Sequence, residues 1–125
     1  MSIKMNPEIK AQWVAALRSG EYKQGQGRLN GSLGFCCLGV LCDLAVKQGV
    51  TEWELIQESH DPCYTCGGYS STLPECVGSW AGFPDGPGLG LGPRVTRWPR
   101  EETLADLNDT GSTFPEIADL IEAQL

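Results

Sequence analysis

The stretch from Phe35 to Val46 constrains the fold more than any other part of the sequence. It has twelve residues, and Asp43 is the only charged one. A helix that is apolar on nearly every face lies in the interior of a domain, with other elements packed around it. A fully buried strand is the alternative, since short apolar runs occur in both structures. The length of the stretch favours the helix, and Gly49 is a plausible end for it.

Two amphipathic helices are predicted at the ends of the chain. The first has Asn6 as its N-cap, Pro7 at its first position and Gly20 at its end. The last begins at a capping box, in which Glu116 follows the cap residue Thr113 by three positions. Each helix carries an apolar stripe at helical spacing, which must pack against another element. The stripes consist of Ile9, Trp13, Ala16 and Leu17, and of Phe114, Ile117, Ala118, Ile121 and Leu125.

The segments between these helices are shorter. Residues 28–35 contain the turn signal Asn30-Gly31 and are predicted to form a hairpin or an edge strand. Residues 51–71 are predicted to be irregular, apart from a helical turn around residues 52–57. Residues 82–93 contain five glycines and three prolines, which is typical of a flexible loop. Short helices are also expected at residues 72–80 and 101–107, and a strand is expected at residues 94–98.

The size of the chain suits one domain with one core. It has 125 residues, of which 41 % are hydrophobic, within the range of globular proteins. The predicted fold class is therefore a small single α+β domain over residues 1–125. In this fold, helices surround a buried central helix beside a short β-hairpin or a small antiparallel sheet.

The formal net charge of −7 limits the possible partners. It argues against direct binding to nucleic acid, because neutralising phosphates requires positive charge. An acidic surface can instead occupy a basic groove on a protein that itself binds nucleic acid, or it can simply keep the protein soluble. No secretory signal and no apolar run long enough for a membrane span are visible. A cytoplasmic location with reduced cysteines is therefore expected.

Three blocks of the sequence carry a resemblance to a known family. They are Glu21-Tyr22-Lys23-Gln24-Gly25 with Gly27, Phe35 to Leu44, and Leu104 to Asp109 followed by Phe114 to Ala118. As a set they resemble small uncharacterised proteins encoded by tailed bacteriophages and prophages. The resemblance covers roughly two thirds of the chain and leaves out residues 51–71 and the glycine-rich loop. It implies a phage origin and brings no chemistry with it. Small accessory phage proteins often act against host defence, so it also implies such a role by analogy.

The middle of the chain offers a candidate zinc site. Cys63 and Cys66 have the spacing of a metal knuckle, in which two thiolates hold one tetrahedral zinc ion. His60 and Cys76 would complete a closed set of one nitrogen and three sulfurs, which is typical of structural zinc. A redox-labile pair of Cys63 and Cys66 is one alternative, and cysteines without a function are another.

The best candidate for a ligand site is the loop from Lys23 to Arg28. Gly25 and Gly27 expose backbone amides, and the two cations add positive charge, which together suit a phosphate. The loop matches neither a Walker motif nor a dinucleotide fingerprint. An ordinary surface turn is the alternative, although the loop belongs to the blocks that carry the resemblance. The predicted site also includes Tyr22, Gln24, Asp43, Asn108 and Asp109.

Two parts of this predicted site depend on contacts that the sequence does not determine. Asn108 and Asp109 are turn formers, but if their turn packs near Lys23, a polar pocket results. Asp43 is a charge within the buried helix and needs a partner. Pairing with Arg28 or Lys23 would be structural, whereas facing a ligand pocket would be functional.

Two further groups of residues are interpreted as structural. The cysteines of the apolar stretch lack a second histidine that could act as their base, so they are interpreted as small buried residues. A basic cluster with one aromatic residue is expected to pair with neighbouring acids rather than with nucleic acid. The cysteines are Cys36, Cys37 and Cys42, and the basic cluster consists of Arg94, Arg97, Trp98 and Arg100.

These observations favour a binding protein. The first hypothesis is a non-catalytic, phage-encoded accessory protein that binds and inhibits a host antiviral defence protein, as an anti-CRISPR-like or other anti-defence inhibitor would. The alternative is a small-molecule binder that sequesters a nucleotide immune signal at the loop of residues 23–28. An enzyme of unknown type is the second alternative, for which only carboxylates and cysteines remain as candidates.

Overall fold

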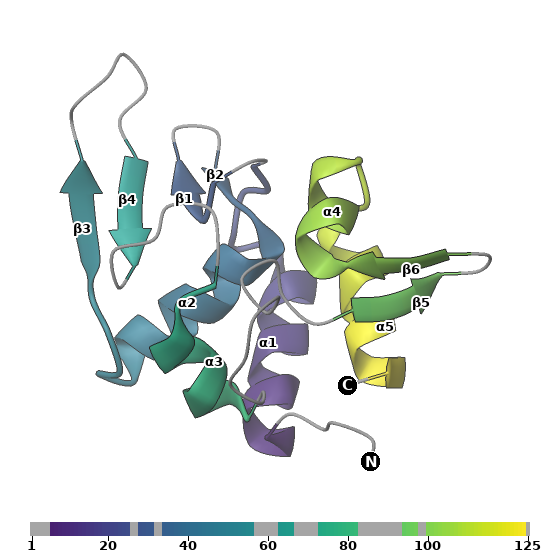
Figure 1. The fold of residues 1–125 in the computed structure, drawn as a ribbon, viewed down its shortest axis with the longest axis horizontal. Coiled ribbons are helices and arrows are strands. Elements are labelled where there is room, and N and C mark those ends of the chain that lie inside the picture. Colours follow the sequence, from purple (N-terminus) through teal and green to yellow (C-terminus); the bar gives the residue numbers. More distant parts are fainter. Residues whose placement is uncertain are drawn as a thin grey trace.

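Helix α2 (Cys37–Lys47) lies at the centre of the fold, as the apolar stretch predicted (Figure 1). The computed structural model describes residues 6–25, 28–31, 34–56, 63–66, 73–82, 94–97 and 100–124. Cys36 is the N-cap of α2, and the first six residues of the helix are all buried. The other described elements are α1 (Pro7–Ser19), β1 (Asn30–Gly31), β2 (Gly34–Phe35), β3 (Trp53–Ile56), β4 (Cys63–Cys66), α3 (Glu75–Ala81), β5 (Arg94–Arg97), β6 (Arg100–Thr103), α4 (Leu104–Asp109) and α5 (Phe114–Gln124).

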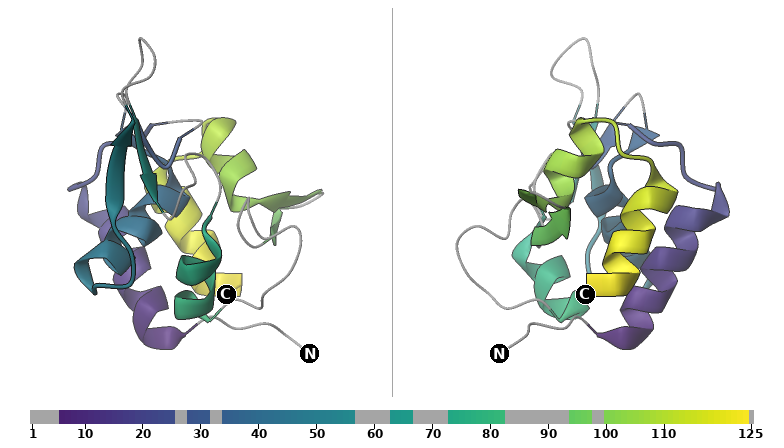
Figure 2. Two further views of the ribbon diagram at one scale, coloured as in Figure 1. Left: turned by 60° about the vertical axis from the view of Figure 1, so that its left-hand side comes forward. Right: turned by 90° about the vertical axis from the view of Figure 1, so that its right-hand side faces the viewer.

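Helices α1 and α5 lie side by side, and α1 also packs against α2 (Figure 2). Their predicted caps are confirmed. The Asn6 side chain accepts a hydrogen bond from Glu8 N at 2.9 Å, and Thr113 Oγ1 accepts one from Glu116 N at 3.4 Å. Trp13 of α1 has no exposed surface, and its Nε1 donates to a main-chain carbonyl at the start of α2 at 3.0 Å. The terminal helices are thus held to the core by the apolar stripes from which they were predicted.

Strands β3 and β4 correct the expectation of an irregular segment over residues 51–71. They pair antiparallel, with Trp53 opposite Cys66 and Leu55 opposite Tyr64, so the helical turn expected around residues 52–57 is wrong as well. Together with β1 and β2, which confirm the predicted hairpin, they form an antiparallel sheet in the order β2-β1-β4-β3. A four-residue strand has little local signal of its own, because it is stabilised mainly by its cross-strand neighbours.

The C-terminal part differs from the sequence prediction at one boundary. Residues 100–103, three of which were expected to be helical, form β6 and pair with β5 in a separate two-stranded antiparallel sheet. Helix α4 begins only at Leu104, because Thr103 is its N-cap. Thr103 Oγ1 accepts a hydrogen bond from Asp106 N at 3.2 Å. Such a side-chain acceptor satisfies a backbone N–H that the start of a helix leaves unpaired, and it marks the point where the helix can begin.

The two hairpins, β3–β4 and β5–β6, project from opposite sides of the helices (Figure 1). Among the described elements, five helices and two small antiparallel sheets confirm the predicted α+β class. No helix in the described ranges is long and apolar enough to cross a membrane. The predicted loop beyond Gly82 lies outside the described residues, and so do Trp98 and the side chains of the basic cluster.

Candidate functional site

The loop of residues 23–28 meets Asn108 in space, a contact that the sequence could only suggest. Gln24 Nε2 donates hydrogen bonds to Asn108 Oδ1 at 2.9 Å and to the carbonyl oxygen of Ser112 at 2.7 Å. Gln24 Oε1 accepts a hydrogen bond from Phe114 N at 3.2 Å. One side chain therefore links the loop to both α4 and α5.

Asn108 is fully buried and links the same loop to the central helix. Its Oδ1 also accepts a hydrogen bond from Cys37 N at 3.2 Å, and its Nδ2 donates to the carbonyl oxygen of Gly25 at 2.8 Å. Cys37 and Phe114 are the first residues of α2 and α5, so two helix starts obtain acceptors for otherwise unpaired N–H groups. We call Gln24 and Asn108 the amide pair. The predicted approach of Asn108 to this loop thus takes the form of a buried structural link, and a ligand-binding role for Asn108 stays a prediction.

The backbone of the loop is engaged within the protein too. Gly25 N donates to the carbonyl oxygen of Phe35 at 2.7 Å, and Phe35 N donates to that of Lys23 at 2.8 Å. A phosphate site needs free amides, so the bonded amide of Gly25 weakens the nucleotide-binding alternative. Of the other predicted site residues, Lys23 and Asp109 are exposed, Arg28 is partly exposed, and Gly27 lies outside the described residues.

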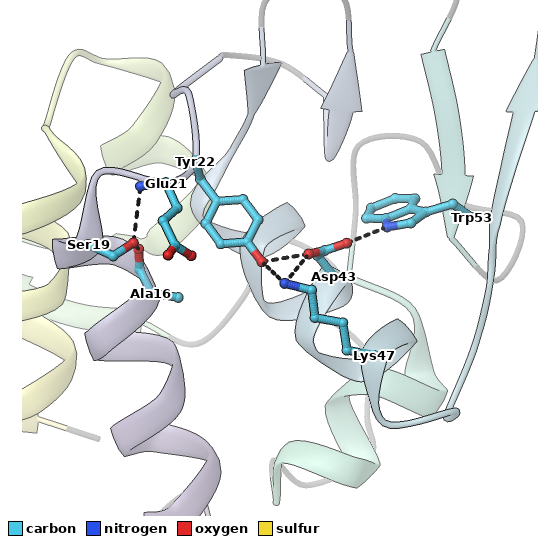
Figure 3. Close-up of polar contacts among 7 residues, drawn as sticks. All are labelled: Ala16, Ser19, Glu21, Tyr22, Asp43, Lys47 and Trp53. Atoms are coloured by element: carbon cyan, nitrogen blue, oxygen red, sulfur yellow. Dashed lines mark hydrogen bonds and ion pairs between the residues drawn. The ribbon is translucent and has the colours of Figure 1, made fainter.

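Asp43 is held by three side chains from different parts of the chain (Figure 3). Tyr22 Oη donates to Asp43 Oδ2 at 2.5 Å, and Trp53 Nε1 donates to Asp43 Oδ1 at 3.1 Å. Lys47 Nζ lies 3.4 Å from Asp43 Oδ2 and donates to Tyr22 Oη at 3.1 Å. We call these four residues the Asp43 cluster. The sequence suggested that Asp43 pairs with Arg28 or Lys23, and these contacts correct that suggestion. Through Tyr22 and Trp53, the cluster ties the segment before the loop of residues 23–28, and also β3, to α2.

The electrostatics of the Asp43 cluster suit a structural role. Burial raises the pKa of Tyr22, and the hydrogen bond to Asp43 raises it further. The hydrogen bond from Lys47 to Tyr22 raises the pKa of Lys47. Phe35 makes T-shaped contacts with the rings of Tyr22 and Trp53, with centroids 5.1 and 6.1 Å apart. Tyr22 is therefore neutral at physiological pH, and both carboxylate oxygens of Asp43 accept hydrogen bonds from side chains of the protein.

The three cysteines of the central stretch are buried, as interpreted from the sequence. Burial raises the pKa of Cys36 to about 11 and that of Cys37 well above its ordinary value. Contact with the thiol of Cys66 and burial both raise the pKa of Cys42. Cys36 Sγ accepts a hydrogen bond from Gly39 N at 3.3 Å and so caps α2. Thiols with a raised pKa carry little thiolate at neutral pH, which favours packing over nucleophilic chemistry.

The structure places two members of the proposed zinc set in different environments. Cys66 is fully buried, with its Sγ 3.9 Å from Thr51 Oγ1, whereas Cys76 is exposed on α3. His60 and the side chain of Cys63 lie outside the described residues. In the rest of the described chain, no three metal-binding side chains lie together. The backbone from Cys63 to Cys66 is strand β4. The zinc site stays a prediction.

Alkylation of the native protein tests the zinc set directly. Brief treatment with iodoacetamide is expected to modify Cys76 before Cys36, Cys37, Cys42 or Cys66, because Cys76 is exposed and the others are buried. Peptide mass spectrometry after quenching locates the label, and Cys76→Ser is the control. A zinc site would produce the opposite result. Cys76 would then be protected until a chelator is added, and native mass spectrometry would show the excess mass of one zinc ion.

An exposed apolar pair on the β3–β4 hairpin was missed by the sequence analysis. Leu55 and Tyr64 lie opposite each other and keep 47 % and 40 % of their surface exposed. Residues two positions apart along a strand lie on the same face, so Leu55 and Tyr64 share a face with the neighbouring pair, Trp53 and Cys66. That neighbouring pair packs against the core. The hairpin extends beyond α2, so the face that is buried at its base is uncovered further out (Figure 1). The alternation of Trp53-Glu54-Leu55 was the available signal.

The hairpin belongs to a strongly acidic part of the chain. Between Gln48 and Pro93 the sequence contains six acidic residues and neither lysine nor arginine. Two of the six, Glu52 and Glu54, are exposed and flank Trp53 in the chain. Exposed apolar side chains are typical of protein-binding surfaces, and the negative charge of the hairpin indicates a basic partner. We call the set of Glu52, Glu54, Leu55 and Tyr64 the hairpin surface.

A shallow groove of about 480 Å³ lies along α1 and α5, and no residue of this hairpin lines it. Ala11 and Ala15 line it, together with charged side chains that include Arg18. Arg18 pairs with Asp119 and Glu122 of α5, with N–O distances of 2.6 Å in both cases. None of the residues predicted for ligand or metal binding lines this groove, which makes it a suitable place for control substitutions.

Comparison with known proteins supplies a family and no activity. A search of curated proteins found no match, and a search of solved structures found none either. The family described as Domain of unknown function (DUF8296) matches residues 5–125, a range that runs from α1 to α5. The amide pair, the Asp43 cluster and the hairpin surface all lie within the matched range. The chain therefore belongs to the DUF8296 family.

Proposed function

We propose that this chain is a non-catalytic accessory protein of phage origin that binds and inhibits a basic protein of host antiviral defence. The observation that carries the proposal is the hairpin surface, where Leu55 and Tyr64 are exposed together on a segment without positive charge. Burying such a pair would supply affinity, and the exposed carboxylates of the same hairpin would favour a basic partner and speed association. The proposed site of action is the host cytoplasm, where the cysteines stay reduced.

The state of the reactive groups supports binding over catalysis. Catalytic groups are typically poised by a shifted pKa and left accessible to a substrate. Here the buried thiols of Cys36 and Cys37 have raised pKa values, and the carboxylate of Asp43 is occupied by Tyr22 and Trp53. Among the described residues, the groups with the most strongly shifted pKa values are therefore groups that contribute to the core.

The proposed phage origin rests on the resemblance, and the structure supplies a physical reason why its blocks occur together. Gln24 of the first block, Cys37 of the second, and Asn108 and Phe114 of the third are joined by the hydrogen bonds of the amide pair. The three blocks therefore form one structural unit at the starts of α2 and α5. Their joint presence indicates a shared fold, and the shared fold supports a common origin.

The test uses host strains that each carry one antiviral defence system and are challenged with a phage that the system blocks. Expression of the protein is expected to restore plaque formation where it binds the defence protein. Leu55→Ser combined with Tyr64→Ser is expected to weaken that complex about 30-fold, roughly 2 kcal/mol, because truncating central apolar side chains commonly removes this much binding energy. Calorimetry with the purified defence protein measures the affinity.

A matched double substitution at exposed positions of α1, Gln12→Ala with Ala15→Ser, should leave affinity and plaque formation unchanged. Both double variants should fold, since all four side chains are exposed, and their unfolding temperatures should fall by no more than a few degrees. Full activity of the Leu55 and Tyr64 variant would assign inhibition to another surface. Failure of the unmodified protein to restore plaques in any strain would remove the anti-defence role.

A further inference from the structure

The outer edge of β3 adds a second feature to the hairpin surface. β3 stands last in the strand order, with β4 on one side and no strand of the described chain on the other (Figure 1). In an edge strand, alternate N–H and C=O groups point away from the sheet and can pair with another chain. Leu55, the most exposed large apolar residue of the described chain, lies on this strand. Main-chain pairing groups and an apolar contact surface therefore occur at the same place.

The two faces of the sheet differ in chemistry at this edge. Leu55 lies on the face that it shares with Tyr64, where apolar surface is exposed. Glu54 lies on the opposite face and is exposed as well. A strand added beside β3 would direct its side chains to the same two faces in alternation. One set of its side chains would meet the apolar face, and the other would meet the negative charge of Glu54.

From this placement we infer that β3 takes up an extended segment of the partner in which basic and apolar residues alternate, adding it to the sheet as a further strand. The inference rests on the proposed function for the existence of a partner and adds the mode of its recognition. Main-chain hydrogen bonds provide the affinity, and the alternation provides the specificity. A second copy of the chain fits less well, because two β3 strands side by side bring their acidic residues together.

A synthetic peptide of alternating lysine and valine, blocked at both ends, is the probe. Titrated into the isotope-labelled protein, it is expected to shift the backbone amide resonances of Trp53–Ile56 and to slow hydrogen exchange at the outward-facing amides of β3. Added salt should weaken the effect, since charge attraction contributes to it. The same peptide with glutamate in place of lysine should produce neither change, because its charges face Glu54.

Two N-methylated forms of the peptide separate strand addition from simple charge attraction. In an extended strand, the N–H groups that face one neighbour belong to alternate residues. Methylation of the backbone nitrogens of the lysine residues should therefore differ in effect from methylation of the backbone nitrogens of the valine residues. One form is expected to lose affinity by at least about tenfold, while the other binds like the parent peptide. Equal binding of both forms would overturn the inference, and so would unshifted resonances at Trp53–Ile56.

A charge-reversed variant, Glu52→Lys with Glu54→Lys, completes the test. It should bind the lysine–valine peptide at least about tenfold more weakly and keep its unfolding temperature, because both residues are exposed. Unchanged affinity would contradict the role of these charges. If the unmodified protein is a dimer without the peptide and this variant is a monomer, the edge of β3 would be assigned to a second copy of the chain instead.

The two proposals fail in different ways. A protein that restores plaques through Leu55 and Tyr64, but whose β3 does not take up the peptide, keeps the proposed function and loses this mode of recognition. A protein that takes up the peptide with the expected difference between the methylated forms, but restores plaques in no strain, keeps the edge site and loses the role in defence.

Discussion

Gly39→Ala is expected to lower the free energy of unfolding by about 3 kcal/mol. Gly39 lies in α2 where Leu29 crosses the helix, and a Cβ at this position would overlap the carbonyl oxygen of Leu29 and lie 2.6 Å from its carbonyl carbon. Leu29 is fully buried, so its backbone has no free space to retreat into. The preference of helices for alanine over glycine, about 1 kcal/mol, offsets only part of this loss. Chemical denaturation followed by circular dichroism measures the change.

Gly78→Ala is the matched control, since Gly78 is a buried glycine within helix α3. Its added Cβ would meet only Leu73 Cδ2, at an ordinary contact distance of 3.8 Å. This variant is expected to be as stable as the unmodified protein or more stable by up to about 1 kcal/mol. Equal stability of the Gly39 and Gly78 variants would show that the Leu29 segment can move away, and that the close approach is not required by the fold.

Asn108→Ala is expected to lower the free energy of unfolding by about 3 to 5 kcal/mol. It removes the partners of two buried main-chain groups, the carbonyl of Gly25 and the N–H of Cys37, and one of the two acceptors of Gln24 Nε2. A buried polar group left unpaired costs about 1 to 3 kcal/mol. Asn108→Asp should be at least as destabilising, because a carboxylate would face the carbonyl oxygen of Gly25 in the interior. Urea unfolding measures both variants.

Two controls define the role of the amide pair. Asp106→Ala changes an exposed residue on the same helix and is expected to cost less than about 1 kcal/mol. Gln24→Ala combined with Asn108→Ala should cost less than the sum of the two single changes, because both remove the same hydrogen bond. If Asn108→Ala cost less than about 1 kcal/mol but abolished inhibition of the defence protein, Asn108 would return to the binding role predicted from the sequence.

The helices could be predicted because their signals act over short distances. Asn6 and Thr113 mark helix starts through hydrogen bonds to N–H groups two and three positions away. The apolar stretch of α2 needed no knowledge of its neighbours to be assigned to the interior. The start of α4 was misplaced because Thr103, the residue that caps it, was assigned to the helix itself.

The strands and the contacts of the candidate site could not be predicted in the same way. β3 is paired with a segment several residues further along the chain, and its own four residues carry only a brief alternation. Gln24 and Asn108 are 84 positions apart, and both were predicted as ligand-binding residues, with a surface turn as the alternative for each. Their contact follows from the packing of α4 against α2 and α5, which no local pattern encodes.

By itself, the sequence determined an acidic α+β domain with a buried central helix, because capping residues and apolar spacing act within a few turns of the chain. It also singled out Gln24, Asn108 and Asp43 as residues in need of an explanation. Only the tertiary structure decided that the amide pair faces inward, that Tyr22 and Trp53 from outside α2 hold Asp43, and that the hairpin surface is left outside. Burial depends on which distant segments meet, and that is a property of the packed chain as a whole.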